Sequence, residues 1–113
     1  MSLDFLRAPV GILDYEIAEE KAAALGRMGR ALEAVLARLR EFDAAHPRLD
    51  AADSTQARRA LLMEAGNALW MFVVQREACG LRNNRTLMRD YNVPGEVQQC
   101  MGAVPAASVR AAT

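Results

Sequence analysis

The apolar residues of the chain recur at helical spacing in two long segments. In residues 13–43 the spacing is clearest for six side chains at alternating steps of three and four: Leu25, Met28, Leu32, Val35, Leu39 and Phe42. This spacing places them on one face of an α-helix about 45 Å long. No segment alternates apolar and polar residues over the length of a strand. The pattern therefore predicts an all-α protein.

The second segment, residues 54–79, is apolar on every side in its central part. The run from Ala68 to Val74 has no polar side chain and contains the only tryptophan, Trp70. A helix that is apolar all the way round is typical of one buried on several sides. Its predicted core face is Leu62, Ala65, Leu69, Phe72 and Val73, widened by Leu61, Trp70, Met71 and Val74. The rest of the chain is expected to be organised around this helix.

Turn and cap residues separate the two long helices. His46-Pro47 ends the first helix, because the residue before proline avoids the α region. Asp53 or Ser54 is the expected N-cap of the second helix, and Gly80 its left-handed C-cap. The pattern thus predicts an antiparallel helical hairpin.

The regions outside the hairpin are shorter and less regular. Pro9 and Gly11 interrupt the helical pattern, which predicts an irregular N-terminal arm. Asn83 or Asn84 can cap a short helix, and Pro94 can begin another. The predicted single domain comprises an arm (1–12), helices over 13–43, 54–79, 84–91 and 94–101, and a tail (103–113).

Small residues form a ridge on the first long helix. Ala18, Ala22 and Gly26 follow one another at i, i+4 spacing, and Gly29 lies close by. Each glycine in a helix interior costs up to about 1 kcal/mol relative to alanine. We expect these glycines to allow the close approach of another element.

A single hairpin cannot bury a helix that is apolar on every side. A second copy would complete a four-helix bundle with two-fold symmetry. The alternative is a compact monomer in which the N-terminal arm and the short helices cover Trp70. The pattern favours the homodimer.

Charge adds an asymmetry between the two halves of the chain. Fourteen basic and fourteen acidic residues give a net charge of zero, which argues against general attraction to nucleic acid or membranes. Residues 1–53 nevertheless carry seven bases and ten acids, a net −3, and residues 54–113 carry seven and four, a net +3. Helices packed against each other would show such complementarity. The alternative interpretation is that the second half of the chain presents a basic functional surface.

The chain shows few groups that could carry chemistry. Cys79 and Cys100 are too few for a disulfide framework or a zinc site and are expected to be small buried hydrophobes, and His46 has no ligand at metal spacing. There are no paired carboxylates and no phosphate-binding loop. We therefore predict neither an enzyme nor a cofactor or metal. With no signal peptide and no apolar run near the roughly 20 residues of a membrane span, a cytoplasmic location is expected.

A basic cluster follows the second long helix. The candidate site for an anion or a partner consists of Arg76, Arg82, Asn83, Arg85 and Arg89. Arginine suits this role because its guanidinium group matches carboxylate and phosphate. The alternative is that Arg76 forms an ion pair with an acid of the first helix, such as Glu16, Glu19 or Glu20, and fixes the register. The charges of the two halves favour the ion pair.

Residues 86–101 have the outline of a helix-turn-helix. The DNA-binding version of this motif would lay residues 95–99 against base edges. The fit is partial, because Gln98 occupies the usual buried position and Glu96 faces where phosphates would lie. The predicted function is therefore a non-enzymatic, homodimeric interaction or structural protein, with a small DNA-binding regulator as the alternative.

Three stretches carry a resemblance to a known group of proteins: VGILDYEIAEEKAAALGR (10–27), WMFVVQREACGLRN (70–83) and MRDYNVPGEV (88–97). They resemble those of short uncharacterised bacterial proteins that are grouped as a domain of unknown function. The resemblance covers most of the chain. It implies no activity, substrate or site residues.

Overall fold

The computed structural model of the protein describes residues 2–102, with side chains from residue 11 onward. This part of the chain forms four helices: α1 (Ser2–Ala45), α2 (Ala52–Ala78), α3 (Asn84–Asp90) and α4 (Gly95–Gln99). The all-α prediction is thereby confirmed. The predicted tail, residues 103–113, lies outside the described residues.

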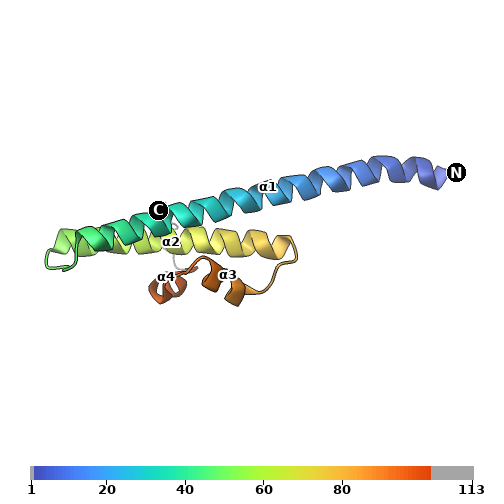
Figure 1. Cartoon of the computed structure of the whole chain (residues 1–113). Coiled ribbons are helices and arrows are strands. Elements are labelled where there is room, and N and C mark those ends of the chain that lie inside the picture. Colours follow the sequence, from blue (N-terminus) through green and yellow to red (C-terminus); the bar gives the residue numbers. More distant parts are fainter. Residues whose placement is uncertain (1, 103–113) are drawn as a thin grey trace, which may run out of the picture.

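The two long helices form an antiparallel hairpin, and α3 and α4 lie on another side of α2 (Figure 1). At 1.5 Å per residue, α1 is about 66 Å long and α2 about 40 Å. The molecule is 73 Å long in its greatest dimension, which follows α1 (Figure 1). The N-terminal part of α1 therefore extends well beyond the end of α2.

The start of α1 corrects the predicted irregular arm over residues 1–12. The helix begins at Ser2 and runs through both Pro9 and Gly11. Proline removes one backbone hydrogen bond and glycine adds an entropic cost, but each acts at a single position. Once a helix has formed, each further residue contributes its own hydrogen bond. The helix over the following residues can thus extend through these two weak positions.

The connection between α1 and α2 matches the prediction at one end only. Helix α1 ends at Ala45, directly before His46-Pro47, as expected. The N-cap of α2 is Ala51, which makes no side-chain hydrogen bond, so the predicted cap by Asp53 or Ser54 is wrong. Asp53 lies in the first turn instead, where its negative charge still favours the helix dipole.

The chain leaves α2 through the predicted glycine turn. Gly80 adopts a φ of +82°, and the Leu81 N–H donates to the carbonyl oxygen of Arg76 at 2.8 Å. This six-residue bond is typical of a Schellman motif. Asn83 then caps α3, because its Oδ1 accepts from the N–H of Thr86 at 3.2 Å. Asn92, at a φ of 50°, turns the chain toward α4, which is shorter than the predicted helix over 94–101.

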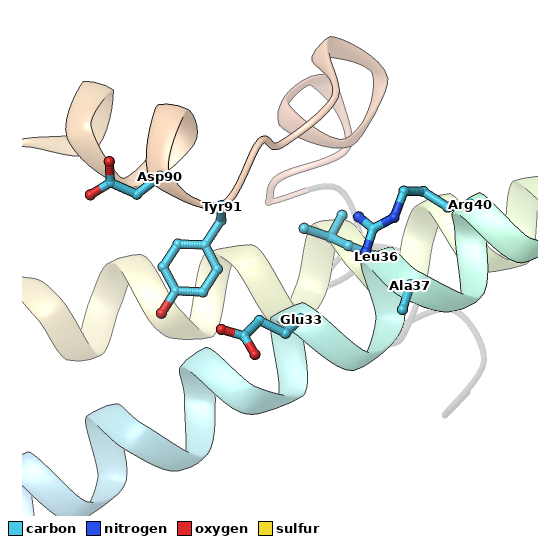
Figure 2. A pocket seen from close by; sticks show the side chains of 6 residues that line it. All are labelled: Glu33, Leu36, Ala37, Arg40, Asp90 and Tyr91. Carbon is cyan, nitrogen blue, oxygen red and sulfur yellow. The ribbon is translucent and has the colours of Figure 1, made fainter.

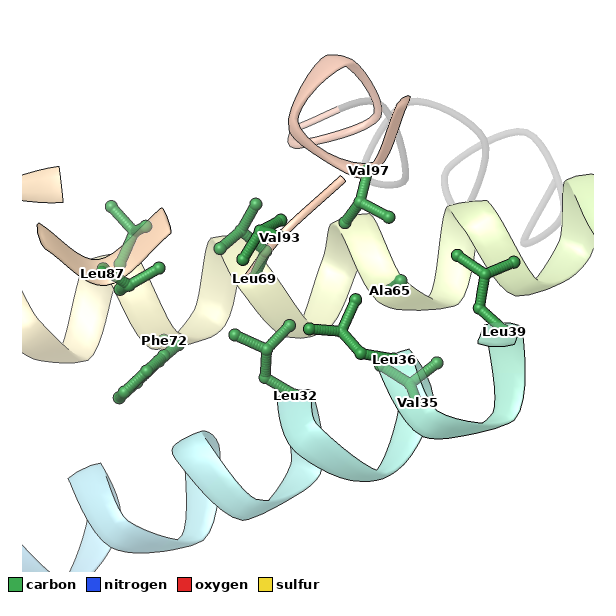
Figure 3. Packing of buried hydrophobic residues seen from close by; sticks show 11 residues of the cluster. Leu32, Val35, Leu36, Leu39, Ala65, Leu69, Phe72, Leu87, Val93 and Val97 are labelled. Carbon is green, nitrogen blue, oxygen red and sulfur yellow. The ribbon is translucent and has the colours of Figure 1, made fainter. Parts of the chain in front are cut away.

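The core lies where α2 meets both neighbouring layers (Figure 3). Its buried members are Leu32, Val35, Leu36 and Leu39 of α1, Ala65, Leu69, Phe72 and Val73 of α2, and Leu87, Val93 and Val97 of the C-terminal part. The predicted seam of α1 is confirmed, with Leu25, Met28 and Phe42 half-buried at its ends. Most of this apolar contact involves α2, as its sequence predicted.

One side of α2 departs from the prediction. Trp70, Met71 and Val74 were expected to widen its core face, but they are 40%, 45% and 45% exposed. The reason is geometric: α1 covers one side of α2, and α3 with α4 covers a second (Figure 1). Within a single copy, the third side of this apolar helix stays open.

Glycines permit two close contacts in the core. A Cβ at Gly29 would lie 2.8 Å from the hydroxyl oxygen of Tyr91, so the expected close approach is confirmed there. A Cβ at Gly66 would lie 2.6 Å from the carbonyl oxygen of Cys100. Only glycine allows the chain after α4 to approach α2 so closely.

Candidate functional site

The predicted basic cluster is only partly assembled. The guanidinium Nη2 of Arg76 donates to the carbonyl oxygen of Asn83 at 3.2 Å, which brings these two predicted site residues together. Arg82, Arg85 and Arg89 are exposed, and Arg89 lies 3.5 Å from the carboxylate of its neighbour Asp90. No hydrogen bond among the described residues joins these three arginines to the rest of the cluster.

Arg76 does not make the predicted ion pair with an acid of α1. The antiparallel hairpin places it opposite Leu25, Gly26 and Gly29, further along α1 than Glu16, Glu19 and Glu20. Its guanidinium carbon lies 5.9 Å from the centre of the Phe72 ring, while Nε is buried without a hydrogen-bond partner. Arg76 therefore keeps an unused donor.

The N-terminal part of α1 extends past the end of α2 (Figure 1). The end of α2 is level with Lys21, whose Nζ donates to the carbonyl oxygen of Ala78 at 3.4 Å and whose own carbonyl accepts from Gln75. Residues 2–17, which we name the overhang, lie beyond this point and are about 24 Å long (Figure 1). The large apolar side chains described there are exposed by 48–66%: Ile12, Leu13, Tyr15 and Ile17.

A groove runs along α1 directly after the overhang. It consists of two adjoining hollows of about 360 and 460 Å³ that share Ala22 and Leu25. We name it the small-residue groove, after the residues of α1 along it: Ala18, Ala22, Gly26 and Gly29. Helix α2 and Tyr91 form its other side, and Lys21, Arg30 and Arg76 line it with positive charge. The ridge predicted from the sequence is thus exposed to this groove.

A further hollow, of about 600 Å³, lies between α1 and the end of α3 (Figure 2). The Tyr91 ring points from α3 toward Glu33 of α1 (Figure 2). Arg40 and Asp90 also line this hollow, and like Glu33 they are exposed residues. Two carboxylates and one guanidinium give the hollow no dominant charge.

Arg58 makes contacts between three helices that the sequence analysis does not identify. Its Nε donates to the Asp43 carboxylate at 2.8 Å, and its Nη1 and Nη2 donate to Glu96 at 2.7 and 2.9 Å. One half-buried arginine thus joins α1, α2 and α4. No local signal marks it, because both carboxylates are distant in sequence.

The ion pairs of Arg58 predict an acid-dependent loss of stability. Hydrogen bonds from Arg58 lower the pKa of Asp43 and that of Glu96 below their ordinary values of 3.8 and 4.5. A carboxyl group with a lowered folded pKa stabilises the fold above its ordinary pKa, and this contribution disappears as the pH falls through the folded value. Arg58→Met should therefore cost about 1 kcal/mol near neutral pH and less below about pH 4. Urea titrations of both proteins at several pH values measure this, and a pH-independent difference would contradict it.

Residues 86–101 form two short helices joined by a turn, and their apolar side chains face α2. Leu87, Val93 and Val97 belong to the buried core (Figure 3). Helix α4 has five residues, about 7.5 Å, and Glu96 on it binds Arg58. These contacts account for the apolar pattern of the segment as a cover for α2.

Chemistry-bearing groups are sparse in the described part of the chain. No three His, Cys, Asp or Glu side chains between residues 11 and 102 lie together as metal ligands. Cys79 and Cys100 are half-buried thiols. None of the helices described combines the length and apolar character that a membrane span requires.

The fold and its surfaces define an all-helical protein built on a long hairpin, with one helix projecting far beyond the other. The chain belongs to the family of unknown function DUF6665, which it matches over residues 3–110. The resemblance seen in the sequence is thus confirmed. Comparisons with curated proteins and with solved structures gave no match.

Proposed function

We propose that the protein is a non-enzymatic helical interaction protein that works as a homodimer. The observation that carries this proposal is the overhang, which exposes Ile12, Leu13, Tyr15 and Ile17 along a helix that extends beyond its intramolecular partner. Most helical stability in proteins comes from packing, and the overhang continues α1 without packing on α2. Pro9 and Gly11 weaken the overhang further. A helix built in this way needs a binding partner.

Burial of the overhang would give a substantial gain in free energy. Covering a leucine or isoleucine side chain contributes about 1.5–3 kcal/mol relative to leaving it exposed. Leu13 and Ile17 lie four residues apart, so a single partner helix can cover both. The open third side of α2, around Trp70, adds a second apolar surface of the same kind.

Charge favours a second copy of this chain as the partner. The overhang, residues 2–17, carries three acids and one base, a net −2, whereas residues 54–113 carry a net +3. In a two-fold dimer, the acidic overhang of each copy can meet the basic half of the other. A symmetric arrangement satisfies both overhangs at once. It also satisfies the tendency of helical hairpins to assemble into bundles.

The homodimer predicts a measurable mass and a concentration-dependent stability. Light scattering coupled to size exclusion should give twice the chain mass of 12.4 kDa at micromolar concentration. The melting temperature should rise with protein concentration, because association favours the folded state. A monomeric mass at micromolar concentration would rule the homodimer out.

A further inference from the structure

We infer that the overhang of one copy docks into the small-residue groove of the second copy, and reciprocally. This inference rests on the proposed homodimer and specifies its interface. Two features with no complement inside one copy are brought together: an exposed apolar helix and an open groove beside it on the same helix. The partner is thus a second copy of residues 2–17.

The shape of the groove suits a helix. Ala18, Ala22 and Gly26 allow a partner backbone to approach α1 closely, because short side chains reduce the distance between helix axes. A Cβ added at Gly26 would meet only the guanidinium end of Arg30, at 3.2 Å. The space beside Gly26 is therefore bounded by a flexible side chain, which can move aside for a ligand helix.

The charges of the groove suit an acidic helix. Arg30 and Arg76 form no ion pair with any described carboxylate. Lys21, at the other end, donates to a backbone carbonyl. Glu33 is the single carboxylate among the lining residues. Asp14 and Glu16 on the overhang can supply the missing negative charge.

Symmetry allows both docking events to occur together. The overhang and the groove are consecutive on α1, so two antiparallel α1 helices related by a two-fold axis near residues 18–20 overlap reciprocally. In that register, Ile12 of one copy is level with Gly26 of the other, and Glu16 is level with Ala22. At these two positions large side chains lie against small ones, and Leu13 is level with Leu25, an apolar residue of the groove.

Separate variants of the overhang and the groove test this interface. Leu13→Asp with Ile17→Asp places charge on the overhang, and Gly26→Leu fills the groove with a better helix former. Each should raise the dissociation constant of the dimer at least about 100-fold, because at least two buried apolar side chains lose their contacts. Ala34→Leu, on an exposed position of α1, is the matched control and should dimerise as the wild type does. Circular dichroism confirms that each variant remains helical.

Mixing the two defective variants gives the decisive measurement. The intact overhang of the Gly26→Leu protein can still dock into the intact groove of the overhang variant. Fluorescence energy transfer between labelled copies should therefore show heterodimers at concentrations where neither variant pairs with itself. Monomeric variants that fail to associate on mixing would overturn reciprocal docking. If both variants remain dimeric, the interface lies elsewhere, such as around Trp70, whereas a monomeric wild type would overturn the homodimer itself.

Discussion

Leu69→Ala is expected to lower the free energy of unfolding by about 2–5 kcal/mol. Leu69 is fully buried in the centre of α2 and belongs to the same core cluster as Val93, which follows α3 (Figure 3). Because α2 packs against both α1 and the C-terminal helices, a cavity at this position removes contacts from the common core. Neighbouring side chains relax only in part around such a cavity.

Urea denaturation at a fixed protein concentration measures the effect of Leu69→Ala. Leu49→Ala is the matched control, because it makes the same substitution at a residue that is 40% exposed. The control should change the free energy of unfolding by no more than about 0.5 kcal/mol. Equal effects of the two substitutions would show that Leu69 is not the centre of the core.

Gly66→Ala and Gly26→Ala should have opposite effects on stability. An added Cβ at Gly66 would lie 2.6 Å from a backbone carbonyl oxygen of Cys100, so α2 and the end of the C-terminal part must separate. Such overpacking costs about 1–3 kcal/mol. Within a single copy, the new methyl group at Gly26 meets only the end of Arg30, and the higher helix propensity of alanine should add up to about 1 kcal/mol.

Thermal unfolding of the two alanine variants tests these opposite effects on stability. At a protein concentration low enough for the wild type and both variants to be monomeric, Gly66→Ala should melt below the wild type and Gly26→Ala above it. The pair controls for helix propensity, since both substitutions replace a glycine within a long helix. If Gly66→Ala also melts above the wild type, Cys100 does not pack against α2 as described.

The overhang projects beyond the core of the protein. The core that holds α1 to α2 ends near Lys21, yet the helix continues through residues 2–17 with apolar and acidic side chains. Exposed apolar surface of this extent is typical of an interaction site. The chemistry-bearing residues, by contrast, are dispersed among exposed positions and structural ion pairs. This distribution supports a role in assembly.

Features that depend on neighbouring residues could be predicted from the sequence. The α1 seam follows from the period of the helix, and the turn at Gly80 follows from the freedom of glycine at positive φ. The cap at Asn83 requires only that its side-chain oxygen precede the donating backbone N–H, that of Thr86, by three residues. Each of these depends on a few consecutive residues.

Contacts between distant residues could not be predicted in the same way. Arg58 binds Asp43 and Glu96, which lie 15 and 38 residues away in the sequence. Arg76 was expected to meet an acid of α1, but the register of the hairpin places it opposite Gly26 and Gly29. The observed position of Arg76 thus lies several residues further along α1 than the predicted one. Hydrophobic periodicity alone does not distinguish such registers, because the seam repeats every seven residues.

The amino-acid sequence by itself determined the helical class, the hairpin and the residues of α1 that face α2, because periodicity and turn chemistry act locally. Tertiary structure alone decided where α1 stops contacting α2, and hence that residues 2–17 project and that Trp70 lies on an open side. The physical reason is that exposure depends on which surfaces the other helices cover. An apolar residue in a sequence predicts burial, but only the packed arrangement shows whether its own chain supplies the covering surface.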